Sequence, residues 1–88
     1  MYKNICIVGL GYVGLPLAHA FSSKFQVVGL DISEKRIKDL KSGIDSTSML
    51  SNEQMHEVKN NDIKLTANYD DAKNCDVYII TVPTPINK

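Results

Sequence analysis

The sequence has 88 residues, enough for one domain with a modest core and too few for a second domain. Ten Lys and Arg balance ten Asp and Glu, so the formal net charge is zero, which argues against a sequence-independent grip on nucleic acid. No apolar run approaches the ~20 residues that span a bilayer. The N-terminus runs through a short apolar stretch into a glycine turn, so it predicts a strand and not a signal peptide, and we expect a cytoplasmic protein.

The first half of the chain predicts strands and helices in alternation. Residues 4–9 (NICIVG) are a short apolar run ending in glycine, which is typical of a buried parallel strand. Apolar residues at helical spacing predict a helix over residues 12–23. Pro16 is tolerated there because the first amides of a helix have no internal acceptor. Residues 25–31 (FQVVGLD) predict a second strand that ends in an acidic residue.

The sequence patterns for the remaining elements are weaker, except for that of the last strand. Ser33 is a plausible N-cap for a helix with Ile37 and Leu40 on its apolar face and Gly43 as its stop. The segments that follow predict, in order, a polar turn (44–51), a helix capped by Ser51 or Asn52 (52–61), a strand (62–68), a turn or single helical turn (69–75), and an apolar strand closed by prolines (76–85).

This alternation predicts an α/β fold, a Rossmann-type doubly wound parallel sheet with right-handed crossovers. The usual doubly wound order places the four predicted strands as 3-2-1-4. Ligands bind such sheets at the switch point, which here lies between the first and fourth strands.

The sequence GLGYVG has the G-x-G-x-x-G pattern between a predicted strand and a predicted helix. Gly9 would allow the tight turn, Gly11 would let the backbone approach a pyrophosphate, and Gly14 would let the helix pack closely on the strand. The amides around Tyr12 and Val13 would face the phosphates, helped by the positive end of the helix dipole. The alternative is a tight turn that binds nothing.

An acidic residue about twenty positions downstream of the glycines completes the fingerprint. Asp31 closes the second strand, where a carboxylate accepts hydrogen bonds from ribose hydroxyls and repels a 2′-phosphate, which favours NAD over NADP. Arg36 could meet a 2′-phosphate, or lie over the adenine face. The alternatives are a helix-capping role for Asp31 and a solvated helix charge for Arg36.

Other polar residues give weaker signals. Thr81 and Thr84 offer hydroxyls at the end of the last strand, although a simple proline-closed strand end explains this segment too. Cys6 and Cys75 are interpreted as buried, reduced thiols of a cytosolic chain, and the alternative is a disulfide or redox pair. Neither has a His and a carboxylate nearby in sequence, so no nucleophile is assigned. We expect no metal site, since neither histidine, at positions 19 and 56, has partners at ligand spacing.

Three segments, GLGYVGLPLA, GLDISEKRIKDLKSGID and DVYIITVPTP, resemble the N-terminal NAD-binding domain of the UDP-glucose/GDP-mannose dehydrogenase family. The segments KSGIDST and TVPTPI are most similar to its bacterial UDP-N-acetylglucosamine/N-acetylgalactosamine 6-dehydrogenases. The resemblance implies oxidation of the C6 hydroxyl of a UDP-sugar to a carboxylate for cell-surface polysaccharide synthesis. By position, it implies NAD contacts at Gly11, Tyr12, Val13, Asp31, Arg36 and Thr84.

In the family that this chain resembles, a catalytic cysteine lies in a downstream segment, and neither cysteine here matches it. Residues 1–88 are therefore expected to be part of an NAD-binding domain, without the sugar-binding and dimerisation regions and inactive alone. The strand over residues 76–82 would then leave an open apolar edge through which we expect self-association, with Ile80 expected to be buried. The alternatives are a regulatory nucleotide-binding module of the potassium-transport type and the NAD domain of a β-hydroxyacid dehydrogenase.

Overall fold

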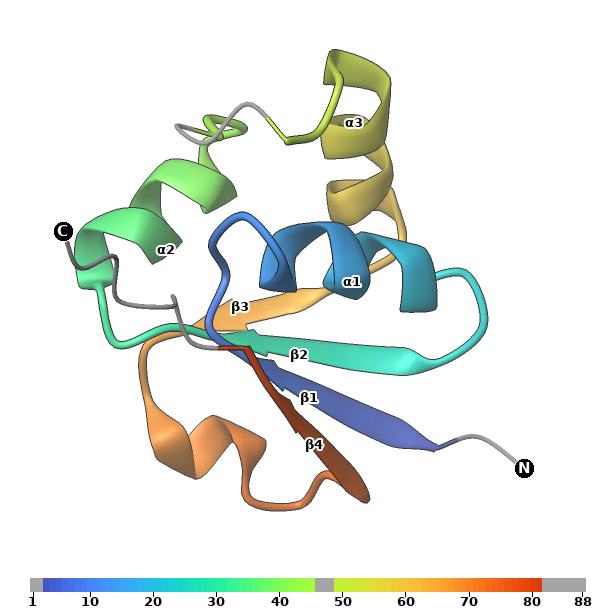
Figure 1. Ribbon diagram of the computed structural model, residues 1–88, viewed down its shortest axis with the longest axis vertical. Coiled ribbons are helices and arrows are strands. Elements are labelled where there is room, and N and C mark those ends of the chain that lie inside the picture. Colours follow the sequence, from blue (N-terminus) through green and yellow to red (C-terminus); the bar gives the residue numbers. More distant parts are fainter. Residues whose placement is uncertain (1–2, 46–48, 82–88) are drawn as a thin grey trace, which may run out of the picture.

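The structure, a computed structural model, describes residues 3–45 and 49–81. Its strands form one parallel sheet in the order β3-β2-β1-β4, which confirms the predicted 3-2-1-4 arrangement (Figure 1). Along the chain the elements are β1 (Asn4–Val8), α1 (Gly14–Phe21), β2 (Gln26–Leu30), α2 (Glu34–Lys41), α3 (Asn52–Asn60), β3 (Lys64–Thr66), a 3₁₀ turn η1 (Tyr69–Ala72) and β4 (Val77–Ile80).

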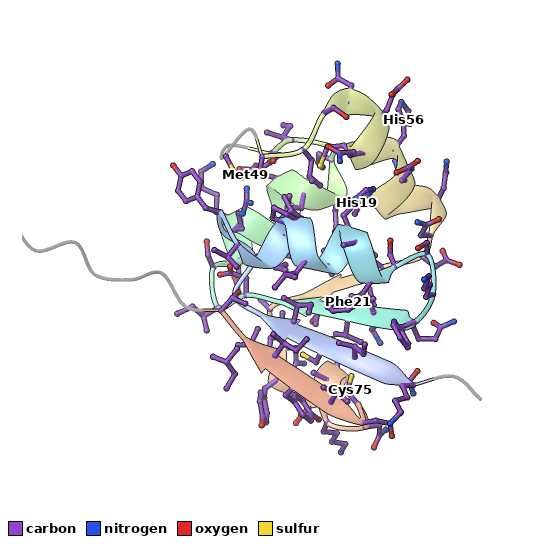
Figure 2. The ribbon with its side chains drawn as sticks, turned by 45° about the vertical axis from the view of Figure 1, so that its right-hand side comes forward. His19, Phe21, Met49, His56 and Cys75 are labelled. Carbon is purple, nitrogen blue, oxygen red and sulfur yellow. The ribbon has the colours of Figure 1, made fainter. Side chains whose placement is uncertain are left out.

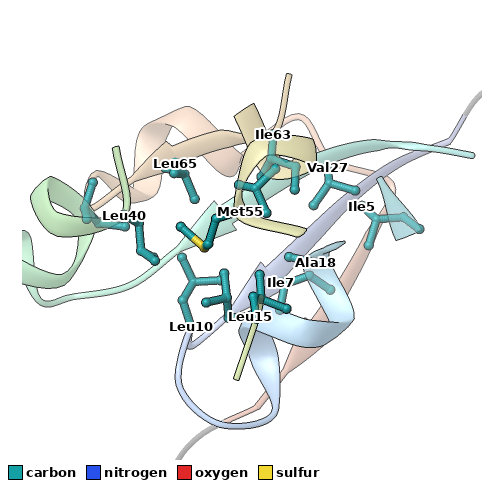
Figure 3. Packing of buried hydrophobic residues seen from close by; sticks show 13 residues of the cluster. Ile5, Ile7, Leu10, Leu15, Ala18, Val27, Leu40, Met55, Ile63 and Leu65 are labelled. Carbon is teal, nitrogen blue, oxygen red and sulfur yellow. The ribbon is translucent and has the colours of Figure 1, made fainter. Parts of the chain in front are cut away.

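The sheet separates two apolar clusters because successive strand side chains point to opposite faces. On one face, Ile5 and Ile7 of β1 pack with residues of α1, α2 and α3 (Figure 3). On the other face, Cys6 of β1 packs with Leu30 and with Ala72 of η1. Figure 1 shows the same arrangement, with the three helices above the sheet and η1 below it.

The helix ends follow the predicted capping chemistry. The Ser33 hydroxyl accepts a hydrogen bond from the Arg36 amide at the start of α2. Gly43, at φ 86°, ends α2 in a Schellman motif, in which the Ile44 amide donates to the Asp39 carbonyl. Ser51 caps α3, and not Asn52, through a capping box with Gln54.

Helix α1 and strand β3 are among the elements that are shorter than the patterns predict. Helix α1 begins at Gly14 and not at Tyr12, because the residues just before it form the turn that leaves β1. Strand β3 spans Lys64–Thr66 and not residues 62–68. The strand does not begin at Asp62, because a φ of 60° at this residue is incompatible with an extended strand.

Strand β4 spans Val77–Ile80, shorter than the predicted 76–82. The expectation that Ile80 is buried is wrong, since 68% of its surface is exposed. The physical reason is that β4 lies at the edge of the described sheet, where its faces are sparsely covered. Val82, Pro83 and Pro85 lie outside the described residues. Within the described residues, no helix is long and apolar enough to cross a membrane.

Candidate functional site

Two of the three glycines in the turn after β1 are required by the fold itself. Gly9 has a φ of 95°, and a Cβ there would lie 2.1 Å from the Thr81 carbonyl oxygen. A Cβ on Gly14 would lie 1.6 Å from the Gly9 carbonyl oxygen and 2.5 Å from Thr81 Oγ1. The close approach at Gly14 is therefore between α1, the turn and the end of β4, which confirms the close packing predicted for this residue.

The space around Gly11 differs from that around Gly9 and Gly14. Apart from its two chain neighbours, no atom of the described residues lies within 4 Å of a Cβ on Gly11, and the φ of Gly11 lies outside the left-handed region. The described protein gives no steric reason for glycine at this position. Open space beside a glycine backbone fits a site where a ligand approaches the main chain closely.

The backbone around Gly11 presents donors to this open space. The amides of Gly11, Tyr12 and Val13 have no acceptor within the part of the chain that the structure describes. The side chains of Tyr12 and Val13 are exposed, and Val13 is the N-cap of α1 without a side-chain cap bond. Unpaired amides at the start of a helix, where the dipole is positive, suit an anionic ligand such as a pyrophosphate.

Asp31 lies beside this turn, at the carboxyl end of β2. Its Oδ2 accepts a hydrogen bond from the Leu10 amide at 2.9 Å, and its Oδ1 accepts one from the Ser33 amide at 2.9 Å. The carboxylate thus ties the glycine turn to the entrance of α2. Each carboxylate oxygen can accept a further hydrogen bond, so these contacts leave acceptor capacity for a ribose.

Arg36 is not a solvated helix charge, which removes that alternative. Only 11% of its side chain is exposed. Its Nε donates to the Leu10 carbonyl oxygen at 2.7 Å, and its Nη1 lies 3.1 Å from Asp45 Oδ1. The guanidinium therefore bridges the glycine turn and the segment after α2.

The end of β4 closes the site from the other side. The Thr81 amide donates to the Val8 carbonyl at 2.7 Å, and its hydroxyl lies 2.7 Å from the Gly9 carbonyl oxygen. The Thr81 hydroxyl is therefore directed at the turn and holds it. Thr84, the other predicted hydroxyl, lies outside the described residues.

The cysteines lie away from the glycine turn, on the face of the sheet opposite α1 (Figure 2). Cys6 is fully buried, and burial raises the pKa of its thiol to about 11, with Cys75 nearby adding to the rise. Burial also raises the pKa of Cys75, which is half-buried. Both thiols stay protonated near neutral pH, so neither is poised as a nucleophile.

The histidines show no sign of a metal site. His19 of α1 lies 2.6 Å from Glu57 of α3, a contact that joins the two helices. His56 lies on α3 (Figure 2). Within residues 3–45 and 49–81, no cluster of His, Cys, Asp and Glu could hold a metal ion.

Leu10 and Asp45 take part in the site although no sequence motif marks them. Leu10 is fully buried and offers both its amide and its carbonyl to long-range side-chain partners. Asp45 lies in a segment whose sequence predicts only a polar turn, and its carboxylate pairs with Arg36. The sequence carries no periodic signal for such a contact.

Comparisons with known proteins agree with this site. Residues 3–88 match the NAD binding domain of the UDP-glucose/GDP-mannose dehydrogenase family. The chain is 49% identical over 88 residues to protein CapL of Staphylococcus aureus, covering all of this chain and 20% of CapL. It is 49% identical over 84 residues to a UDP-N-acetyl-D-glucosamine 6-dehydrogenase of Salmonella typhi, covering 96% of this chain and 19% of that protein.

A solved UDP-D-ManNAc dehydrogenase from Pyrococcus horikoshii superposes with a TM-score of 0.82 at 34% identity, covering 96% of this chain and 21% of that one. The chain thus spans about one fifth of the length of the relatives it matches. The glycine turn, the open space at Gly11 and the acidic end of β2 fit the cofactor that the family match implies. The chain therefore belongs to the UDP-glucose/GDP-mannose dehydrogenase family, as part of its NAD-binding domain, and its cofactor is NAD.

Proposed function

We propose that residues 1–88 are one part of the NAD-binding domain of a nucleotide-sugar 6-dehydrogenase. The enzyme would oxidise the C6 hydroxyl of a UDP-sugar to a carboxylate for cell-surface polysaccharide synthesis. The similarity to CapL and to a UDP-N-acetyl-D-glucosamine 6-dehydrogenase supports this substrate class. Neither a potassium-transport module nor a β-hydroxyacid dehydrogenase has comparable support, because the family match covers residues 3–88.

The observation that carries the proposal is the open space at Gly11 beside unpaired amides. In the proposed site, the pyrophosphate lies against Gly9, Gly11 and Gly14 and accepts hydrogen bonds from the Tyr12 and Val13 amides. Gly9 and Gly14 act there by shaping the turn. Thr84 would complete the site from beyond β4.

Asp31 is proposed to accept hydrogen bonds from the adenosine ribose hydroxyls. A 2′-phosphate at the same place would meet this carboxylate and be repelled, so NAD should bind more tightly than NADP. Arg36 is proposed to border the adenosine end of the site while its guanidinium contacts Leu10 and Asp45. When bound, NAD would accept the hydride that is removed when an alcohol is oxidised.

The chemistry at the sugar would depend on groups that these residues do not supply. Oxidation of an alcohol to a carboxylate needs a nucleophile to hold the aldehyde and a base near the reacting carbon. The raised pKa values of Cys6 and Cys75, and their place on the opposite face of the sheet, argue against either as that nucleophile. We therefore propose that this chain alone has no dehydrogenase activity.

Two further parts of the proposal concern location and association. Free thiols at Cys6 and Cys75 are typical of a reducing compartment, which supports a cytoplasmic location. The exposed apolar side chains of β4, Val77, Tyr78 and Ile80, support self-association of this chain through its sheet edge.

Calorimetric titration of the chain with NAD and with NADP tests the proposed cofactor site. We expect NAD to bind at least about tenfold more tightly, the scale of one charge-assisted hydrogen bond. Equal affinities for the two cofactors would contradict the ribose assignment of Asp31. No binding of either cofactor would contradict the proposed site altogether.

A further inference from the structure

The two peptides that flank Leu10 are each held by a side chain from a distant part of the chain. Asp31 binds the Leu10 amide, and Arg36 Nε binds the Leu10 carbonyl. The Leu10 side chain is fully buried, so the residue has little freedom to rotate. Because the peptide between Leu10 and Gly11 is trans, fixing the Leu10 carbonyl also fixes the direction of the Gly11 amide.

The Arg36 guanidinium that holds this carbonyl is itself held by a carboxylate. Asp45 provides the anchor through its Oδ1, 3.1 Å from Arg36 Nη1. Only 3% of the Asp45 side chain is exposed, so the ion pair is shielded from solvent. The other oxygen, Oδ2, accepts hydrogen bonds from the Met49 and Leu50 amides at 2.9 and 3.1 Å, which fixes Asp45 in turn.

We propose that Asp45 is a positioning and specificity-determining residue of the NAD site. It keeps the Arg36 guanidinium on the Leu10 carbonyl, which holds the glycine turn in shape and keeps the positive charge away from the place of a 2′-phosphate. The inference rests on the proposed dinucleotide site, and it assigns Asp45 a role through Arg36 and not a contact with the cofactor.

Charge and geometry both support this role. A guanidinium has a planar fork of donors, which lets it bond the Leu10 carbonyl and the Asp45 carboxylate together. A partly buried cation without its carboxylate partner is destabilised and moves toward solvent or toward another anion. A 2′-phosphate at the neighbouring ribose would be such an anion.

The informative variant is Asp45→Asn. The asparagine side chain has one acceptor oxygen and one donor NH2 group. It therefore cannot accept hydrogen bonds from Arg36 on one side and from the two backbone N–H groups on the other. We expect the NAD dissociation constant to rise about tenfold and the NADP constant to rise less or to fall, so that the ratio of the NADP constant to the NAD constant shrinks. A merely structural weakening would raise both constants in proportion.

A matched control lies on the same helix. Asp39 pairs with Lys35 at 3.0 Å, and this pair is open to solvent on the lysine side, where 85% of the Lys35 side chain is exposed against 24% of the Asp39 side chain. Asp39→Asn removes the same charge and should leave both dissociation constants unchanged, since exposed pairs contribute little. Comparison of the two variants separates the buried contact from a general effect of net charge.

The experiment combines calorimetric titration of NAD and NADP with the NMR resonance of the Gly11 amide in the cofactor-free chain. We expect that resonance to shift in Asp45→Asn and to stay in place in Asp39→Asn. If Asp45→Asn does not fold, Arg36→Lys should give the same shift, because an ammonium cannot reproduce the two-sided contact.

The outcomes separate this inference from the proposed function. A wild-type chain that binds neither cofactor contradicts the proposed function. A wild-type chain that prefers NAD, with an Asp45→Asn variant that keeps the same ratio of constants, overturns the inference alone. So does an unchanged Gly11 resonance in a folded Asp45→Asn or Arg36→Lys chain.

Discussion

A methyl group added at Gly11 should abolish tight NAD binding while leaving the fold intact. In Gly11→Ala the new Cβ has no atom of residues 3–45 or 49–81 within 4 Å, its two chain neighbours apart, and the backbone φ needs no change. Removing glycine from such a position stabilises a protein by about 0.4–1 kcal/mol, through the unfolded chain. The unfolding temperature should therefore stay the same or rise slightly.

Binding should respond in the opposite direction. The methyl group would occupy the space in which the pyrophosphate approaches the turn, so the phosphate would withdraw from the Tyr12 and Val13 amides. Each lost charge-assisted hydrogen bond is worth roughly 1.5–3 kcal/mol, so two of them amount to about 3–6 kcal/mol, or about a hundredfold or more in affinity. Gly11→Val adds more bulk and should remove detectable binding.

Calorimetric titration with NAD, alongside thermal unfolding, measures both effects. Gly14→Ala is the matched control, because its Cβ would lie 1.6 Å from the Gly9 carbonyl oxygen and should cost stability as well as binding. A folded Gly11→Val chain with wild-type affinity for NAD would mean that the turn serves only the fold.

Three other outcomes are expected. Asp31→Ala should lower the affinity for NAD about tenfold. It should also lower the unfolding temperature, because the Asp31 carboxylate accepts hydrogen bonds from the Leu10 and Ser33 amides. An unchanged NAD affinity would exclude a ribose contact. Spectrophotometric assay of the chain with UDP-sugars should show no NADH formation, whereas turnover that disappears in Cys75→Ser would contradict the absence of a nucleophile. Sedimentation should show self-association that Ile80→Lys weakens without unfolding the chain, since Ile80 is exposed; a monomer at high concentration would argue against pairing through β4.

The sheet order and the helix caps could be predicted because their signals are local. Ser33, Gly43 and the Ser51–Gln54 pair act within one turn of helix, so a few adjacent residues carry the information. The apolar runs and the alternation of strand and helix leave few topologies, and the right-handed crossover selects among them.

The contacts around the glycine turn could not be predicted because they join residues far apart in sequence. The bond between Arg36 and the Leu10 carbonyl spans 26 positions, and the bond between Thr81 and the Gly9 carbonyl spans 72. The exposure of Ile80 was missed for a related reason. An apolar strand predicts burial, but burial depends on which elements cover it, and β4 lies at the edge of the described sheet.

We propose above all that the turn between β1 and α1 holds the pyrophosphate of NAD. Amide NMR of the chain during titration with NAD tests it most directly. The largest shifts should fall on Gly11, Tyr12 and Val13, with a second group at Asp31. A hollow of about 360 Å³ lies elsewhere, between α2, α3 and β3, with Leu40 among its lining residues. Shifts confined to that hollow, with the glycine turn unchanged, would contradict the assignment of the site.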